Sequence, residues 1–296
     1  MAICIPAALP AAALLRAEGL EVHEREGAAG RTAPECVQIG IVNLMPTKQT
    51  TEAQILRLLA GAGRPVEAAF FAPLSHVCKN TPQEHIDAFY ADLAQIERMQ
   101  PDGLIVTGAP VEMLEFEQVD YWNELVRLMD HARAQIRSTL YICWAAQAAL
   151  YHFFGVRKYP LPEKCFGVFA HRFTGAAHPL LRGMDEPFLA PHSRHTQVLC
   201  EEIERTPGLR LLAKSEAAGA YLAAEEDGRS VFVTGHSEYD AHTLRLEYER
   251  DRSRGLPIRV PVGYFPEDDP AKEPPLTWRA HSQQLYGSWL SELVCR

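Results

Sequence analysis

Short apolar runs alternate with helix-like segments along most of this sequence, and this alternation limits the chain to a small number of folds. The runs that predict buried strands are residues 37–44, 66–73, 102–110, 140–142 and 229–235. The segments that predict helices are residues 51–59, 83–99, 121–134 and 240–249. Apolar strands separated by helices are typical of a parallel sheet covered on both faces. The sequence therefore predicts an α/β protein with a doubly wound, mostly parallel sheet.

Three segments interrupt this pattern. Residues 1–34 are rich in Ala, Pro and Glu and predict an extended N-terminal arm. Residues 156–200 are rich in Pro, His, Phe and Gly and predict an insertion of loops and short strands. Residues 255–276 contain many prolines and predict a long ordered loop before a last helix near 282–293. We therefore expect an arm over 1–34 and a single α/β domain over 35–296, with an insertion at about 156–200.

Composition argues against several classes of partner. The 296 residues carry 38 acidic and 29 basic side chains, a net charge of −9, with no basic run, so we expect no nucleic-acid or membrane partner. No apolar run is long enough to span a membrane. Seven scattered cysteines without a CxxC pair favour free thiols in a reducing compartment. The apolar N-terminal stretch lacks a preceding basic residue and contains prolines, so we expect no signal peptide and a cytoplasmic protein.

The stretch LYICWAAQAAL, residues 140–150, contains a candidate nucleophile. The apolar end of a strand meets alanine-rich helix formers at Cys143-Trp144. Ligands of open α/β sheets bind at such carboxyl ends of strands. Unpaired N–H groups at a helix start favour an anion, and therefore a thiolate. Cys143 is thus a candidate nucleophile, whereas the alternative is an inert cysteine in the core.

A second strand end, in VFVTGHSEYDAHTL (231–244), supplies the groups that a thiol nucleophile needs. The apolar strand ends at Gly235, and His236 and Glu238 follow it. Glu238 is placed to accept the imidazole N–H and to fix one tautomer of the ring. With Cys143 at the same edge of the sheet, these residues predict a Cys-His-Glu triad of thiolate, general acid/base and orienting carboxylate. The alternative is a loop histidine followed by an acid at a helix start.

Acyl chemistry at such a triad also needs backbone donors for a developing oxyanion. The N–H of Trp144, at the predicted helix start, is one candidate. The TGAP turn (107–110) ends the neighbouring strand and is a second candidate. Taken alone, TGAP is better explained as a simple Gly-Pro turn.

Other polar motifs carry weaker signals. The PHSRH run (191–195) has an H-x-x-H spacing, but no carboxylate or cysteine nearby completes a ligand set, so we expect no metal site. Ser193 and Arg194 could instead face a substrate. Lys164 and Arg250 are surface cations by default, although Arg250 lies on the helix that follows the His236 motif. Neither GxxxxGK[ST] nor a strand-following GxGxxG occurs, which disfavours nucleotide hydrolysis and dinucleotide redox chemistry.

Seven motifs, in order along nearly the whole chain, resemble the homoserine O-acyltransferases of the class I glutamine-amidotransferase-like superfamily. They are NLMPTKQTTEAQILRLL (43–59), NTPQEHI (80–86), DGLIVTGAPVE (102–112), YICWAAQAAL (141–150), FLAPHSR (188–194), VTGHSEYDAHTL (233–244) and YFPEDDP (264–270). The resemblance implies a flavodoxin-like α/β fold. It also implies transfer of an acyl group from acyl-CoA to the side-chain hydroxyl of L-homoserine, a step in methionine biosynthesis.

The resemblance further implies roles for individual residues. The acyl-thioester nucleophile falls on Cys143, the general base on His236 and the third catalytic residue on Glu238. The homoserine-binding residues that it implies are Lys164, Ser193 and Arg250. Cationic side chains suit the carboxylate of an amino acid, and the serine hydroxyl can donate a hydrogen bond near the acyl chain.

The acyl donor can be read from the residue that follows TGAP-x. In this family glycine there leaves room for succinyl, and glutamate favours acetyl. Here the residue is Glu112, whose carboxylate would repel the succinyl carboxylate. We therefore expect acetyl-CoA as the donor, with succinyl-CoA as the alternative.

Three positions depart from the family pattern. Ser237 stands where proline is commoner, Thr47 where lysine is frequent, and His195 where tyrosine is expected. The change at Ser237 should alter only loop stiffness. Thr47 and His195 could lie near the acceptor site, which leaves serine as an alternative acceptor to homoserine.

The resemblance implies a homodimer that uses acetyl-CoA as a co-substrate, without a bound cofactor or metal. As a hypothesis, the reaction is ping-pong, with the 156–200 segment covering the acyl-enzyme against water. The rival enzyme is a glutamine amidotransferase, which uses the same triad, but glycines usually flank its cysteine whereas Ile142 and Trp144 flank this one. The rival outside enzymology is a binding protein of the same fold without turnover.

Overall fold

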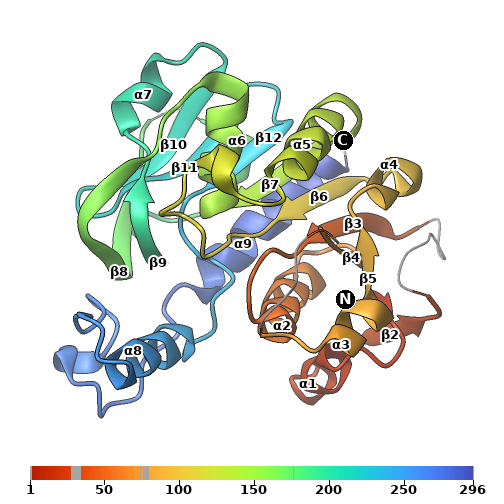
Figure 1. The fold of residues 1–296 in the computed structure, drawn as a ribbon, viewed down its shortest axis with the longest axis horizontal. Helices are drawn as coiled ribbons and strands as arrows, with labels where there is room; N and C mark the ends of the chain where they lie inside the picture. The colour runs from red at the N-terminus through yellow and green to blue at the C-terminus, as the bar shows by residue number, and fades with distance from the viewer. Residues whose placement is uncertain (1, 28–34, 74, 76–79, 176, 296) are drawn as a thin grey trace.

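The computed structural model describes residues 2–27, 35–73, 75, 80–175 and 177–295, and it has one large sheet with helices on both faces (Figure 1). The strands of the sheet follow the order β2-β1-β4-β3-β6-β7-β12-β11-β10-β8-β9, and β5 pairs with β4. The central parallel strands are β3 (Val37–Val42), β4 (Val66–Ala72), β6 (Gly103–Val106), β7 (Ser138–Ile142) and β12 (Ser230–Val233). Numbered along the chain, these five strands have the order 2-1-3-4-5, which is the flavodoxin-like order. The predicted fold class is confirmed.

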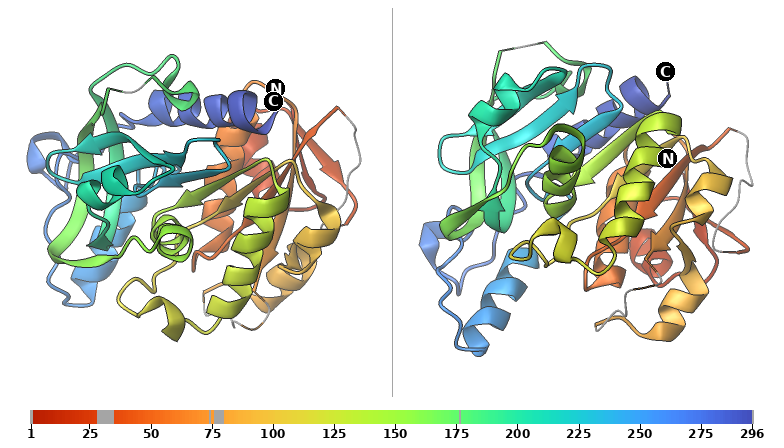
Figure 2. Two further views of the ribbon diagram at one scale, coloured as in Figure 1. Left: turned by 90° about the horizontal axis from the view of Figure 1, so that it is seen from above. Right: turned by 45° about the horizontal axis from the view of Figure 1, so that its top comes forward.

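Helices cover the two faces of the sheet as separate layers (Figure 2). On one face, an apolar cluster combines sheet residues with side chains of α1 (Ala11–Ala17), α2 (Lys48–Ala60) and α9 (Arg279–Trp289). On the other face, a second cluster includes α5 (Trp122–Gln135) and α6 (Trp144–Phe154). The apolar strands predicted from the sequence are buried because both faces are covered.

The N-terminal segment corrects the predicted arm. Within the described residues 2–27, the chain forms β1 (Ile3–Pro6), α1 and β2 (Val22–Arg25), and β1 pairs in parallel with both β2 and β4. The alanines of residues 11–17 build a helix rather than an extended segment, and its apolar side chains are buried with Ile3 and Ile5. Residues 28–34 lie outside the described residues. The predicted boundary at residue 34 therefore does not separate an arm from the domain.

The segment predicted as an insertion over about 156–200 consists largely of two long strands rather than of loops and short strands. β8 (Tyr159–Phe173) and β9 (Phe188–Gln197) pair antiparallel with each other. β8 also pairs with β10 (Leu209–Ser215), which continues through β11 (Gly219–Glu225) to β12. The early prolines of β8 coincide with a register shift between Pro160 and Cys165, which explains why the sequence looks loop-like there. This part of the chain extends the main sheet.

The remaining elements differ from expectation mainly at their ends. The helix predicted over 83–99 is divided into α3 (Gln83–Phe89), β5 (Tyr90–Asp92) and α4 (Gln95–Met99). The α-helices after β9 are α7 (Cys200–Arg205), α8 (Thr243–Ser253) and α9, which a π-helical turn (Leu290–Val294) extends. Residues 256–278 form the expected loop, with one short 3₁₀ turn at Pro266–Asp268. Among the described residues, none of the helices has the length and apolar character needed to cross a membrane.

Two buried histidines couple the stability of this fold to pH. His171 of β8 and His192 of β9 are fully buried, with their Nε2 atoms 3.0 Å apart. Burial lowers the pKa of His171 to about 4, and the charge of Arg194 acts in the same direction. An unfolded histidine titrates near pH 6.5, so between about pH 6.5 and 4 the unfolded chain binds the extra proton. Stability is therefore present above this window and is lost as the pH falls through it.

A His171→Phe variant should show a weaker pH dependence of stability. Because a folded pKa of about 4 lies some 2.5 units below the unfolded value, His171 contributes about 3 kcal/mol to the acid-induced loss. We expect the free energy of unfolding in urea to fall by about that much less between pH 7 and pH 4 in the variant. The control is His195→Asn, which changes an exposed histidine of the neighbouring strand β9. If the free energy of unfolding of His171→Phe depended on pH as steeply as that of the wild type, His171 would not be the source of the acid-induced loss.

Candidate active site

Cys143 occupies a strained turn between β7 and α6. Its backbone has φ 51° and ψ −113°, a conformation that non-glycine residues rarely adopt. Such strain costs on the order of 1–3 kcal/mol and persists where the surroundings fix it. Here the Cys143 N–H donates to the carbonyl of Val233 in β12 at 2.7 Å, and the side chain is buried. The strand-turn-helix junction predicted from the sequence is present.

His236 and Glu238 lie just beyond the end of β12, the strand that pairs with β7. The backbone N–H of His236 donates to the carbonyl of Pro191 at 2.8 Å, which anchors the residue to β9. Its Nδ1–H donates to Oε1 of Glu238 at 2.6 Å, and both side chains are buried. This bond leaves Nε2 on the side of Cys143, and both His236 and Cys143 lie against Gly108. The three residues predicted as a triad are therefore brought together in the predicted order.

The electrostatics of this group favour a charged imidazole. Burial acts to lower the pKa of His236, but the negative charges of Cys143 and Glu238 and their hydrogen bonds outweigh it and raise this pKa well above its usual value. Opposite charges at close range stabilise the charged form of each group. The arrangement therefore favours the imidazolium form of His236 beside Cys143.

Two backbone groups lie where an oxyanion could be stabilised. Trp144 is the first residue of α6, so its N–H has no acceptor within the helix. Gly108, in the TGAP turn after β6, lies against both reactive side chains: a methyl group there would be 3.2 Å from Cβ of Cys143 and 3.5 Å from Cε1 of His236. The Thr107 hydroxyl accepts from the N–H of Leu44 at 2.7 Å and fixes this turn. The TGAP turn is therefore part of the site rather than a remote loop.

The three predicted substrate-binding residues meet at a residue that the sequence did not single out. Lys164 Nζ lies 2.6 Å from Oε1 of Glu247, and the Ser193 hydroxyl donates to the same carboxylate at 2.8 and 2.9 Å. Arg250 Nη2 lies 3.6 Å from Glu247, and its Nε donates to Asp251 at 2.6 Å. Two cations and two carboxylates thus form one cluster, where α8 lies beside the β8–β9 hairpin (Figure 1).

This cluster is close to the triad. The His236 N–H donates to the carbonyl of Pro191 at 2.8 Å, and Pro191 lies two residues before Ser193 in β9. Tyr239 stacks on His236 with ring centroids 4.2 Å apart. The negative charge of Glu247 contributes to the raised pKa of this tyrosine, after burial. An amino-acid substrate in the cluster would therefore lie beside an acyl group on Cys143.

Glu112 is far from Glu247 in the sequence, but both act on Tyr239. After burial, the charge of Glu112 also contributes to the raised pKa of this tyrosine. The Glu112 side chain is half-buried, and its backbone carbonyl accepts from Lys158 Nζ at 2.7 Å. Lys158 also lies over the Phe116 ring, 4.5 Å from its centroid. The structure thus holds the residue predicted to select the acyl donor in a fixed loop near the triad.

Glu247 and Tyr239 are the functional candidates that the sequence interpretation missed. A weak signal existed for Glu247, because it precedes Arg250 by three residues and the two therefore share a helix face. Tyr239 had no signal in the sequence, since its stacking depends on the turn after β12. Among the departures from the family pattern, His195 is exposed and follows Ser193 by two residues in β9, so both lie on one face. No group of three or more metal-binding side chains occurs among the described residues.

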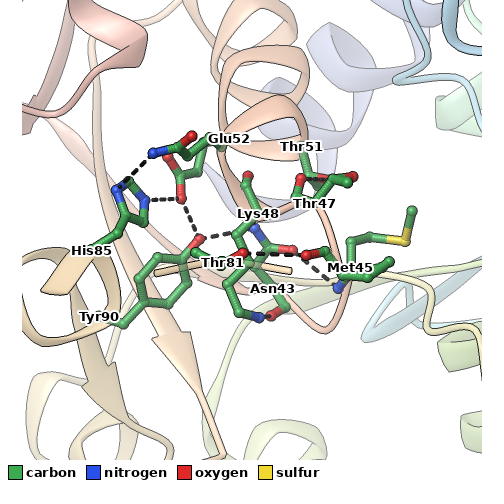
Figure 3. Close-up of polar contacts among 11 residues, drawn as sticks. Asn43, Met45, Thr47, Lys48, Thr51, Glu52, Thr81, His85 and Tyr90 are labelled. Carbon is green, nitrogen blue, oxygen red and sulfur yellow. Dashed lines mark hydrogen bonds and ion pairs between the residues drawn. The ribbon is translucent and has the colours of Figure 1, made fainter. Parts of the chain in front are cut away.

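A buried polar network supports the sheet edge next to the TGAP turn (Figure 3). Asn43, directly after β3, donates to the Tyr90 hydroxyl at 2.9 Å and accepts from Lys48 Nζ through its backbone carbonyl. Tyr90 donates to Oε1 of Glu52 at 2.5 Å, and His85 Nε2 lies 2.8 Å from the same oxygen. The network connects the turn after β3 with α2, α3 and β5. Two of the motifs quoted above, at 43–59 and 80–86, therefore meet in space.

Known proteins resemble this chain over its whole length. The sequence profile described as homoserine O-succinyltransferase matches residues 2–296. The chain belongs to the homoserine O-succinyltransferase family. Among its members, a homoserine O-acetyltransferase of Acetivibrio thermocellus is 49% identical, with 99% of this chain and 96% of that protein aligned. A homoserine O-acetyltransferase of Bacteroides thetaiotaomicron is 48% identical over the same shares. The family predicted from the seven motifs is confirmed.

Solved structures place this member of the homoserine O-succinyltransferase family among proteins of the same fold. A glutamine amidotransferase from Thermotoga maritima superimposes with a TM-score of 0.57 at 13% identity, covering 87% of this chain and 98% of that one. A glutamine amidotransferase from Methylobacillus flagellatus gives 0.55 at 14% identity, covering 88% and 96%. At this identity the likeness concerns the fold alone.

Proposed function

We propose that the protein is a homoserine O-acetyltransferase, which moves the acetyl group of acetyl-CoA to the side-chain hydroxyl of L-homoserine in methionine biosynthesis. The observation that carries the proposal is the buried Cys143–His236–Glu238 arrangement, with the mixed-charge cluster around Glu247 beside it. Relatives at nearly half identity over the full length carry the same name. Because the chemistry requires a reduced thiol, we place the protein in the cytoplasm.

The first half-reaction forms an acetyl thioester on the protein. The Cys143 thiolate attacks the carbonyl carbon of acetyl-CoA, and the backbone N–H groups of Trp144 and Gly108 stabilise the oxyanion of the tetrahedral intermediate. The carbon–sulfur bond to CoA then breaks, and the CoA thiolate leaves, taking a proton from the imidazolium of His236. Glu238 keeps the ring in the tautomer that can take a proton back at Nε2.

The second half-reaction transfers the acetyl group to the amino acid. His236 takes the proton of the homoserine hydroxyl, whose oxygen attacks the thioester carbonyl, and Cys143 leaves as a thiolate paired with the imidazolium. Lys164 and Arg250 suit the substrate carboxylate, while Glu247 and Asp251 suit its ammonium group. The cluster would thus hold the zwitterion by both charges and present its hydroxyl to the acyl group.

Glu112 supports acetyl rather than succinyl as the acyl group. A Glu112→Gly variant should gain activity with succinyl-CoA relative to acetyl-CoA by about 10-fold or more, because a repulsive carboxylate near the acyl chain is removed. The measurement is kcat/KM with each donor. Glu115→Gly, an exposed acid of the same loop, serves as the control. An unchanged donor ratio in Glu112→Gly would contradict the role of this carboxylate.

The function is tested by intact-protein mass spectrometry. The protein is mixed with acetyl-CoA or succinyl-CoA without acceptor, and then with L-homoserine or L-serine. We expect an acetyl adduct that homoserine discharges. Discharge by serine alone would identify a serine acetyltransferase, and a succinyl adduct would identify a succinyltransferase. Release of glutamate from glutamine, with no transfer from either donor, would identify a glutaminase.

A further inference from the structure

Tyr239 lies in the active site with its ring against the general base. The rings of Tyr239 and His236 are nearly parallel, 13° apart, with centroids 4.2 Å from each other. The Tyr239 N–H also donates to the His236 carbonyl at 3.2 Å, which closes the turn between the two residues. The phenol ring thus covers one face of the imidazole.

The surroundings prevent the tyrosine ring from moving away. The indole Nε1 of Trp278 donates to the Tyr239 carbonyl at 2.9 Å, and both residues are buried. The apolar cluster that packs around them also contains Phe166, Leu244, Tyr248, Tyr264 and Phe265. A ring held in this way fixes the plane of the imidazole beneath it.

The charges around His236 favour the protonated form of its imidazole. Its neighbours with titratable groups are Cys143, Glu238, His192 and Tyr239. Burial lowers the pKa of His192 well below its usual value, so this residue stays neutral. Burial also raises the pKa of Tyr239 well above its usual value, with Glu247, Glu238, Cys143 and Glu112 adding to it. The phenol is therefore a neutral ring, with an electron-rich face against the imidazole.

We propose that Tyr239 is a positioning residue whose ring fixes the plane of the His236 imidazole and stabilises the imidazolium through a cation–π contact. A cation within about 6 Å of an aromatic centroid is attracted by the ring, most strongly in a site without water. Stabilising the imidazolium favours the thiolate of Cys143, which is its counter-ion. The proposal rests on the thiolate–imidazolium pair of the proposed function, and it adds a residue outside the triad.

The test measures the thiolate directly, without acyl transfer. Iodoacetamide alkylation of Cys143 is followed by peptide mass spectrometry as a function of pH, which separates this cysteine from the others. Tyr239 is replaced by phenylalanine and then by phenylalanines with one, two and three ring fluorines, which keep the shape but withdraw electron density from the face. Tyr248→Phe, in the same apolar cluster, is the control.

We expect the midpoint of the alkylation profile to rise with each added fluorine, by about one pH unit over the series, and to remain unchanged in Tyr248→Phe. A midpoint that does not respond to fluorination would overturn the proposal, as would an equal shift in the control. Because the readout needs neither acetyl-CoA nor homoserine, failure of the acetyltransferase assignment would leave this result intact. A wild-type midpoint near that of a free thiol would instead contradict the ion pair of the proposed function.

Discussion

A Cys143→Ser variant should lose acetyl transfer by at least about 1000-fold and should form no acetyl adduct in the absence of acceptor. A serine hydroxyl is a far weaker acid than a thiol, so it would not form the ion pair with His236 that the buried site supports. The measurements are the rate of acetylhomoserine formation and the intact mass after mixing with acetyl-CoA.

The matched control is Cys165→Ser. Cys165 lies within β8, and the charge of Cys143 contributes to its raised pKa. Unlike Cys143, it does not follow a strained turn, and it has no histidine partner among the described contacts. It should keep near-normal activity and the adduct. If the acetyl adduct persisted in Cys143→Ser and disappeared in Cys165→Ser, Cys165 rather than Cys143 would be the nucleophile.

A Glu238→Gln variant should lower kcat by about 1000- to 10,000-fold while the protein stays folded. The amide keeps the size of the side chain but can present its NH₂ to Nδ1 of His236, which turns the imidazole to the wrong tautomer for taking a proton at Nε2. It also removes a negative charge that supports the imidazolium. The pH profile of kcat/KM should shift accordingly, since the pKa of His236 would fall.

Glu249→Gln, an exposed acid of α8, is the control for a lost surface charge. It should leave both kcat and the pH profile unchanged. If Glu238→Gln retained more than a tenth of the wild-type kcat, the carboxylate would be a structural group rather than an orienting one.

The triad could be predicted from the sequence because parallel strands place their carboxyl ends at one edge of a sheet. Two apolar runs ended in Cys143 and in Gly235-His236, and the pairing of Ile142 with Val233 in neighbouring strands brings those ends together. Only local patterns and a general rule of topology were needed. The roles of the three residues remain predictions until the variants are measured.

Other features depend on contacts that no local pattern contains. The alanine-rich N-terminus looked like an arm because its helix is short and is stabilised mainly by burial against the sheet. The proline-rich stretch became two long strands because pairing between β8 and β9 overrides weak strand propensity. The role of Glu247 could not be predicted from the sequence, because it depends on the contacts that α8 makes with Lys164 and Ser193 in the folded chain. The resemblance to a family supplied those substrate residues but not the carboxylate that joins them.

The pairing of β7 with β12 has a consequence for the chain as it is made. Synthesis proceeds from the N-terminus, so Cys143 leaves the ribosome well before the strand that holds His236 and Glu238. The nascent cysteine therefore has neither its base nor the Val233 carbonyl that anchors its turn. We expect it to behave as an ordinary thiol until translation reaches β12, so that a growing chain reacts with the cell's activated thioesters no faster than any other free cysteine does.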